Sequence, residues 1–152
     1  LTLLKVMGID FATIAIKSEE ILPEQKLWRG VLVNAIEDTL ISASDRKSSI
    51  IKLEAHDWII NHGEDFDKVC YWSGFTPEHI YEKYVQAIKR GDISFNFKQV
   101  AWGKYYLQYK LYKKCQEIES RKYHRKRLQS LKKAVIEATT AIFTSILIST
   151  AT

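Results

Sequence analysis

The most informative part of the chain is the stretch from Asp65 to Ile88, DFDKVCYWSGFTPEHIYEKYVQAI. It contains two short helical patterns separated by a turn with Gly74, where a left-handed backbone avoids strain at Cβ. Asp65 suits the N-terminal cap of the first helix. Residues 76–78 (TPE) supply an N-cap threonine, a first-turn proline and an early acidic residue for the second. Two short helices joined by a turn that contains glycine are the helix-turn-helix arrangement.

Apolar residues at steps of three and four also predict helices on both sides of this corner, and the chain has only two prolines and six glycines. We expect an all-α fold, a compact helical bundle with a helix-turn-helix corner plus a long basic C-terminal helix. The predicted helices cover about 23–42, 48–61, 65–73, 76–90 and 100–131, and the predicted regions are an N-terminal arm (1–22), the helical bundle (23–91) and a C-terminal basic helix with an apolar tail (92–152).

The apolar faces of these helices predict a core, while the helix over 48–61 turns Lys52, Glu54 and Asp57 toward solvent. The alternation of Ile93, Phe95 and Phe97 suggests a short extended segment before the last helix. The predicted core residues are Trp28, Val31, Ala35, Ile51, Ala55, Trp58, Phe66, Val69, Ile80 and Tyr84.

The second helix of the corner is the candidate recognition helix. Its outward positions include His79, Lys83 and Gln86, whose side chains could contact base edges. Glu78 and Glu82 share that face, and phosphate repels carboxylates. A helix-glycine-helix corner is also common in bundles that bind no DNA, so this motif leaves a structural role open.

Two blocks of the chain, LWRGVLVNAIEDTL (27–40) and EAHDWIINHGEDFDKVCYWSGFTPEHIYEKYVQAI (54–88), resemble small phage- and prophage-associated proteins, some of which resemble regulators of gene-transfer-agent or prophage expression. The resemblance implies a phage-derived regulatory or DNA-associated role without catalysis. The chain departs from the family pattern at Ser73, where alanine is usual, and at Tyr81, where arginine is usual. The matching residues are Leu27, Trp28, Arg29, Ala35, Glu37, Asp38, Trp58, Asp65, Phe66, Val69, Cys70, Gly74 and Pro77.

Charge is distributed unevenly along the 152 residues, whose formal net charge is +5. Residues 110–133 contain ten Lys or Arg and two Glu, so this segment is +8 and the remainder is −3. Such a helix suits contact with phosphates, although a solvated helix, anionic lipid or an acidic protein would also explain it. The candidate phosphate contacts are Arg121, Lys122, Arg125, Lys126 and Arg127.

Aromatic and apolar residues of the C-terminal third have two explanations each. Tyr105, Tyr106, Tyr109 and Tyr112 have helical spacing, which favours packing over a base-stacking platform. The tail over 134–152 is rich in Thr and Ser and shorter than a membrane span, which favours packing on the core or on a second copy. The aromatic helix and the tail are therefore the two candidate surfaces for a homodimer.

The sequence contains no recognisable catalytic or metal-binding motif, and we expect no catalytic residue, no metal and no cofactor. Two cysteines exclude a disulfide-stapled scaffold, and we expect a cytoplasmic protein with reduced thiols. The first hypothesis is a phage-derived, non-enzymatic DNA-binding transcription regulator. The alternatives are a protein-interaction module whose acidic bundle contacts RNA polymerase or a phage component, and a peripheral membrane protein.

Overall fold

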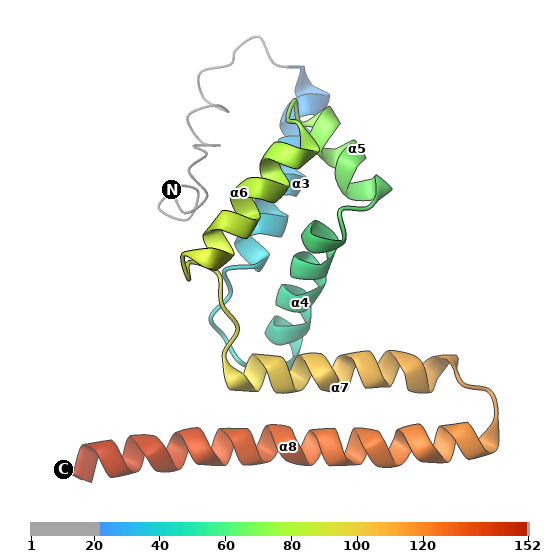
Figure 1. The fold of residues 1–152 in the computed structure, drawn as a ribbon, viewed down its shortest axis with the longest axis vertical. Coiled ribbons are helices and arrows are strands. Elements are labelled where there is room, and N and C mark those ends of the chain that lie inside the picture. Colours follow the sequence, from blue (N-terminus) through green and yellow to red (C-terminus); the bar gives the residue numbers. More distant parts are fainter. Residues whose placement is uncertain (1–21, 152) are drawn as a thin grey trace. The chain divides into compact units, whose positions relative to one another are not determined.

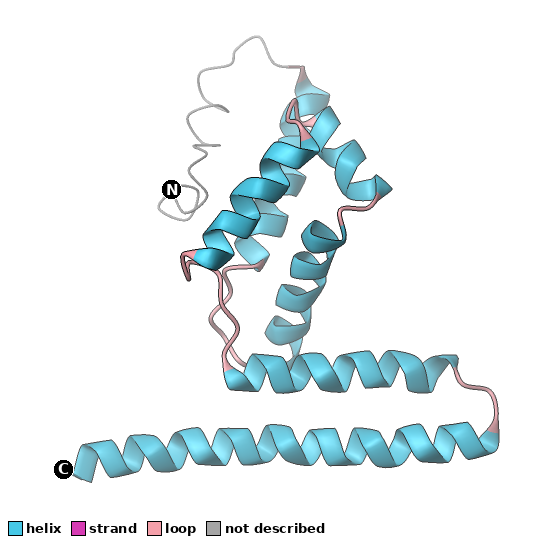
Figure 2. Cartoon of the chain, in the orientation of Figure 1, coloured by secondary structure: helices cyan, strands magenta, loops and turns pink. Residues whose placement is uncertain are grey.

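The computed structural model describes the backbone of residues 22–151 and the side chains of residues 22–138. Its regular elements are all helical over this range, so the all-α prediction is confirmed (Figures 1 and 2). The predicted arm over 1–22 falls almost entirely outside the described residues, as do the side chains of most of the tail. The helices are α3 (Pro23–Asp38), α4 (Arg46–Asn61), α5 (Glu64–Trp72), α6 (Pro77–Lys89), α7 (Phe97–Lys114) and α8 (Ile118–Ala151).

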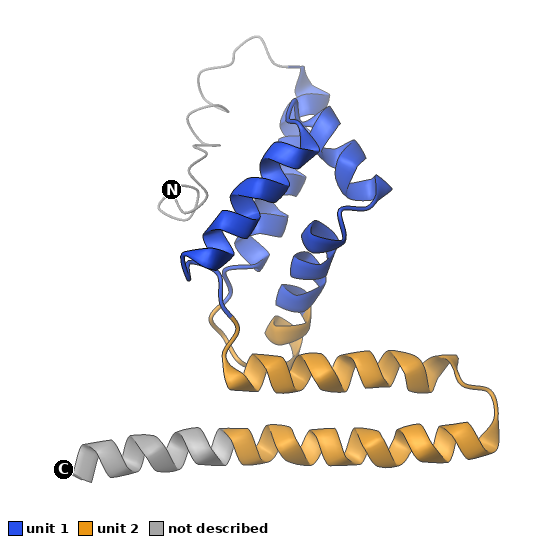
Figure 3. Cartoon of the chain, viewed as in Figure 1, with its two compact units in different colours: residues 1–41, 51–94 blue, residues 42–50, 95–152 orange. Residues whose placement is uncertain are grey.

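The chain divides into two compact units, coloured separately in Figure 3. Unit 1 consists of residues 1–41 and 51–94, and its described part holds α3, most of α4, α5 and α6. Unit 2 consists of residues 42–50 and 95–152, and it holds the first turn of α4 together with α7 and α8. Each unit is therefore built from segments that are distant in the sequence.

Unit 1 packs around an apolar core supplied by all four of its helices. Leu32, Phe66, Ile80 and Tyr84 have no exposed surface, and Ile36 is 1% exposed. Half of the predicted core is correct, because Ala55, Phe66, Val69, Ile80 and Tyr84 are buried. The other half is not fully buried. Trp28 and Trp58 are half-buried and pack against the core, Ala35 and Ile51 are half-buried, and Val31 is 38% exposed.

These errors have a common cause, which is a second apolar stripe on α3 and α4. Leu32 and Ile36 turn inward on α3, and Val31 and Ala35 lie one position away on the same helix. On α4 Lys52, which was predicted on the polar face, is 3% exposed, whereas its neighbour Ile51 is half-buried. The ammonium group of Lys52 donates to the carbonyl oxygen of Ile41 (2.8 Å) and to that of Ser94. Burial lowers the pKa of Lys52.

The corner between α5 and α6 has the predicted turn. Gly74 has a φ of +84°, and the amide of Phe75 donates to the carbonyl of Cys70 at 2.9 Å. Arg29 of α3 holds this turn in place, because its Nε donates to the carbonyl of Ser73 at 2.7 Å and its guanidinium lies 5.1 Å from the centre of the Phe75 ring. The structure therefore confirms the helix-glycine-helix corner and adds a clamp from α3.

Unit 2 contains a helical hairpin, α7 followed by α8, where a single helix over 100–131 was predicted. The chain leaves the helix at Cys115, whose ψ is 129°, and re-enters at Ile118. Residues 115–117 (CQE) contain neither glycine nor proline, so no local signal marks the break. The extended segment predicted near Phe95 and Phe97 is also wrong, because Asn96 caps a helix that begins at Phe97.

Candidate nucleic-acid interface

The start of α7 is fixed by a reciprocal cap. The side-chain oxygen of Asn96 accepts from the amide of Gln99 at 2.8 Å, and the side-chain oxygen of Gln99 accepts from the amide of Asn96 at 3.0 Å. This capping box satisfies two amide groups that a helix N-terminus otherwise leaves unpaired. Gln99 is 2% exposed, so its side of the cap is buried in unit 2, whereas Asn96 is exposed.

The same two residues hold the segment 42–50 against α7. The amide nitrogen of the Gln99 side chain donates to the carbonyl of Ala43 at 3.0 Å, and that of Asn96 donates to the hydroxyl of Ser44 at 2.9 Å. Arg46 follows, with its guanidinium 5.0 Å from the centre of the Tyr105 ring. The first turn of α4 therefore contributes the cations Arg46 and Lys47 to unit 2.

The seam between α7 and α8 is narrow and partly polar. Leu128 and Val135 are buried on α8, at 9% and 2% exposure. Gln108 of α7 is 7% exposed, and its side-chain nitrogen is hydrogen-bonded to Nδ1 of His124 on α8. His124, Leu128 and Val135 occupy one face of α8 at steps of four and seven residues, so the other faces are available to solvent or to a ligand.

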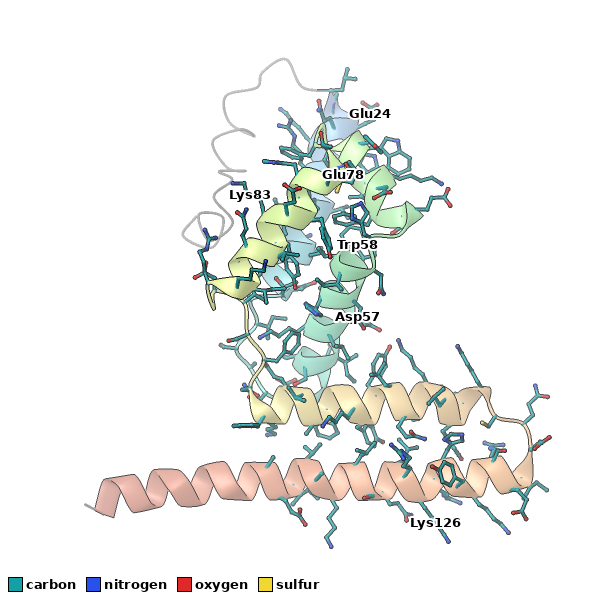
Figure 4. All side chains as sticks on the ribbon, viewed as in Figure 1. Glu24, Asp57, Trp58, Glu78, Lys83 and Lys126 are labelled. Carbon is teal, nitrogen blue, oxygen red and sulfur yellow. The ribbon has the colours of Figure 1, made fainter. Side chains whose placement is uncertain are left out.

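Four of the five candidate phosphate contacts lie on those other faces of α8, whereas Arg121 stands seven residues before Leu128 at the edge of the seam and contacts Tyr112 of α7. All five side chains are exposed, and Figure 4 shows Lys126 projecting away from α7. The set is Arg121, Lys122, Arg125, Lys126 and Arg127. The structure thus places the predicted residues within two helical turns of one another on a solvent-accessible helix.

The net charges of the two units differ more than those of residues 110–133 and the rest of the sequence. Unit 2 contains 14 Lys and Arg against 4 Asp and Glu, which gives +10. Unit 1 contains 9 against 14, which gives −5. Within residues 22–138, the ion pairs of the structure, such as Lys68–Glu64 and Arg90–Asp92, belong to unit 1. The cations of α8 form none among the described side chains.

The tyrosines of α7 already have cationic neighbours. Lys110 Nζ lies 4.4 Å from the centre of the Tyr106 ring, Lys113 Nζ lies 5.2 Å from that of Tyr109, and Arg121 lies 5.1 Å from that of Tyr112. All of these rings are half-buried. The first two contacts lie within α7 and the third joins α8 to α7, and all three leave these ring faces less accessible to a nucleic-acid base.

Tyr123 is an exposed aromatic side chain on α8 that was not among the residues predicted from the sequence. It is 59% exposed and borders an open depression of about 510 Å³, which Lys122, Arg125 and Lys126 also line. A flat aromatic ring among cations is the combination that binds an unstacked base and its phosphates. The step of three residues from Tyr123 to Lys126 places both on one face of a helix, and this spacing is visible in the sequence.

The face of α6 has a different character. His79 and Gln86 are exposed and Lys83 is half-exposed, as the helix-turn-helix hypothesis requires. Glu78 and Glu82 are exposed beside them, so the five outward residues sum to −1. Glu78 and Lys83 both project from α6 in Figure 4. The predicted residues on α6 belong to unit 1 and those on α8 belong to unit 2.

The described residues offer little for catalysis or metal binding. Burial is the largest effect on the Cys70 thiol and raises its pKa to about 12, which keeps it protonated and unreactive. Over the side chains that the structure describes, no three His, Cys, Asp or Glu residues come together to hold a metal ion. In the same part of the chain, no helix is both long enough and apolar enough to cross a membrane.

No protein-family model, curated protein or solved structure matches the chain significantly. The residues behind the phage-family resemblance do have visible structural roles in unit 1. Trp28 packs on Trp72 with ring centres 4.6 Å apart, and Trp58 Nε1 donates to Asp65 at 2.8 Å. Together with Arg29 and Gly74, these residues build the corner.

Proposed function

We propose that the chain is a non-enzymatic, cytoplasmic DNA-binding protein of phage type that regulates transcription and binds phosphates through α8. The observation that carries the proposal is the concentration of charge, +10 on unit 2, with five exposed cations between Arg121 and Arg127. Cations that contact phosphates release condensed counterions from DNA, and this release drives association. In this proposal α6 has a secondary role, because Glu78 and Glu82 flank its polar residues.

DNA is favoured over a lipid surface by the composition of α8. A helix that lies in a membrane interface needs a broad apolar face beneath its cationic one. Over residues 118–138 the exposed large apolar side chains of α8 are Ile118, Tyr123 and Ile136, and they are separated by lysines and arginines. A duplex needs no such apolar face.

The test is equilibrium binding to a fluorescent 24-base-pair duplex at 50–300 mM KCl. Five phosphate contacts predict that log Kobs falls with log [KCl] at a slope of about −4.5. Replacing Arg125, Lys126 and Arg127 with Gln should reduce the steepness of that slope by about 2.7 and weaken binding more than 10-fold at 100 mM KCl. The matched control replaces the exposed Lys26, Lys68 and Lys89 of unit 1 with Gln, which removes the same charge.

Three results would contradict the proposal. One is an absence of binding at 50 mM KCl, and another is an equal loss of affinity in the unit 1 control. The third is flotation with vesicles that contain anionic lipid, lost on deletion of residues 134–152, from a chain that does not bind the duplex. That last result would assign the basic helix to a membrane surface.

A further inference from the structure

Unit 1 carries an open apolar groove of about 760 Å³ between α3, α4 and α5. Its walls include the residues that were predicted to be buried and are not: Trp28, Val31, Ala35, Ile51 and Trp58. The groove has a firm wall, because Trp58 is hydrogen-bonded to Asp65 and meets the Phe66 ring edge-on with ring centres 5.2 Å apart. Exposed apolar surface gathered in one groove marks an interaction site.

The polar residues of this groove are acidic. Asp38, Glu54 and Asp65 line it together with Asn34, and no lysine or arginine does. Burial raises the pKa of Asp38, so its carboxylate is incompletely solvated in the isolated chain. We call this surface the acidic groove. A partner that fills it should bring apolar side chains at helical spacing together with a positive charge.

Unit 2 carries a surface with those properties on α7. Phe97, Val100, Leu107 and Leu111 are 84%, 41%, 49% and 51% exposed. With the exposed Lys104 they follow at steps of three, four, three and four residues, which places them on one face of the helix. We call these five residues the α7 stripe. Helix α7 contains five lysines and no acidic residue.

The two surfaces also agree in length. The groove follows α3 from Trp28 to Asp38, about 15 Å at 1.5 Å per residue. The whole α7 stripe, from Phe97 to Leu111, covers about 21 Å by the same rise, and its part from Val100 to Leu111 covers about 16.5 Å, which is the part that the groove accommodates. Two to three apolar side chains of a helix fit such a groove, in the manner of other helix-in-groove complexes.

We propose that two copies of this chain associate, with the α7 stripe of each copy seated in the acidic groove of the other. Lys104 then approaches the carboxylates of the groove, and Leu107 and Leu111 contact Val31 and Trp58 of the second copy. A second copy is the chosen partner because the chain itself supplies both surfaces with opposite charge. Reciprocal seating would use both surfaces of each copy and has the two-fold symmetry of a closed dimer. The proposal is independent of DNA binding, since neither surface contains a candidate phosphate contact.

The first experiment measures the mass of the full chain in solution by sedimentation equilibrium at 1–100 µM without nucleic acid. We expect a dimer whose dissociation constant rises at least 10-fold in Leu107→Glu and in Val31→Glu. Both side chains are exposed, so the fold should survive, which circular dichroism checks. Ile136→Glu is the matched control, because Ile136 is 59% exposed on α8 outside the stripe, and it should leave the dissociation constant unchanged.

A charge exchange tests the pairing itself. Lys104→Glu and Glu54→Lys should each weaken the dimer, and an equimolar mixture of the two variants should associate more tightly than either alone. A chain that remains a monomer at 100 µM overturns the proposal. So does a dimer that tolerates both Leu107→Glu and Val31→Glu. Binding of monomers to anionic vesicles that depends on Leu107 would overturn it as well, because the stripe would then be a lipid contact.

Discussion

The corner of unit 1 and the hairpin of unit 2 divide two requirements of nucleic-acid binding between them. The corner has a helix–glycine–helix turn that Arg29 clamps, and it presents an acidic face on α6. The hairpin has no recognised motif, and it presents the cations. Residues of the phage-family pattern such as Trp28 and Gly74 therefore shape the corner, whereas other residues set the surface charge.

The units also differ in how they are held together. Unit 1 has a contiguous apolar core, including Phe66 and Tyr84 with no exposed surface. The seam of unit 2 has two buried apolar side chains on the described part of α8 and a polar pair, Gln108 and His124. Regions with few buried apolar contacts open at lower free energy. We therefore expect the hairpin to open more readily than the corner.

The largest expected effect is the loss of the core of unit 1 in Phe66→Ala. Removing this buried ring should lower the free energy of unfolding by about 3–5 kcal/mol. Urea denaturation followed by tryptophan fluorescence measures the change. Val31→Ala is the control, because Val31 lies in the acidic groove at 38% exposure and should cost less than about 1 kcal/mol. Equal losses in the two variants would mean that the groove belongs to the core.

The second effect concerns the hairpin. Leu128→Ala removes a side chain that is 9% exposed, and it should lower the stability of the α7–α8 pair by about 2 kcal/mol. Hydrogen exchange read by mass spectrometry should show faster exchange in α7 and α8 and unchanged exchange in α5 and α6. Ile136→Ala, at an exposed position, is the control. Matching losses of protection in α5 and α6 would show that the units unfold together.

Unit 1 shows which structural features the sequence could predict and which it could not. The corner was predictable because Gly74 and Pro77 act locally on the backbone. The face of α3 that turns toward the core was not predictable, because Val31 and Leu32 are both apolar and only the packing of the whole unit decides which of them is buried. Lys52 was misplaced for a related reason, since the carbonyls that receive its ammonium group belong to Ile41 and Ser94.

The candidate interface was predictable only where it depends on residues that are neighbours in the sequence. The cations of α8 are consecutive in the sequence, so their clustering needs only a helix. The contribution of Arg46 and Lys47 was missed because contacts of Gln99 and Asn96 with residues 43 and 44 bring that segment to unit 2. The hairpin was missed because residues 115–117 have no turn signature.

The third effect tests the geometry of the corner with a pair of glycines. Gly74→Ala should destabilise unit 1 by about 1–2 kcal/mol, because φ is +84° and the new Cβ would meet the side chains of Gln25 and Arg29. Gly30→Ala should stabilise it by about 0.5–1 kcal/mol, because Gly30 lies within α3 with open space around it. Thermal unfolding measures both, and a change of the same sign at both positions would contradict the assigned turn.

The smallest effect is a pH dependence that belongs to unit 1. His56 Nδ1 is hydrogen-bonded to the Tyr84 hydroxyl at 2.6 Å. Burial lowers the pKa of His56 below its usual 6.5; nearby Lys52 lowers it further, and Asp57 opposes the shift. The unfolded chain therefore takes up a proton at a higher pH than the folded one. Stability should be constant above pH 7 and should fall as the pH drops through 6.5 toward the folded-state pKa.

Urea titrations between pH 5 and 8 measure this slope, and His56→Gln should make it shallower because glutamine does not titrate. Burial also raises the pKa of Tyr84, so its hydroxyl stays neutral throughout that range. Tyr84→Phe is the control, because it removes the hydrogen bond and leaves His56 packed against a ring, so the pKa of His56 should remain lowered. If the slope is the same in His56→Gln and the parent chain, the acid sensitivity of the protein has a source other than His56 of unit 1.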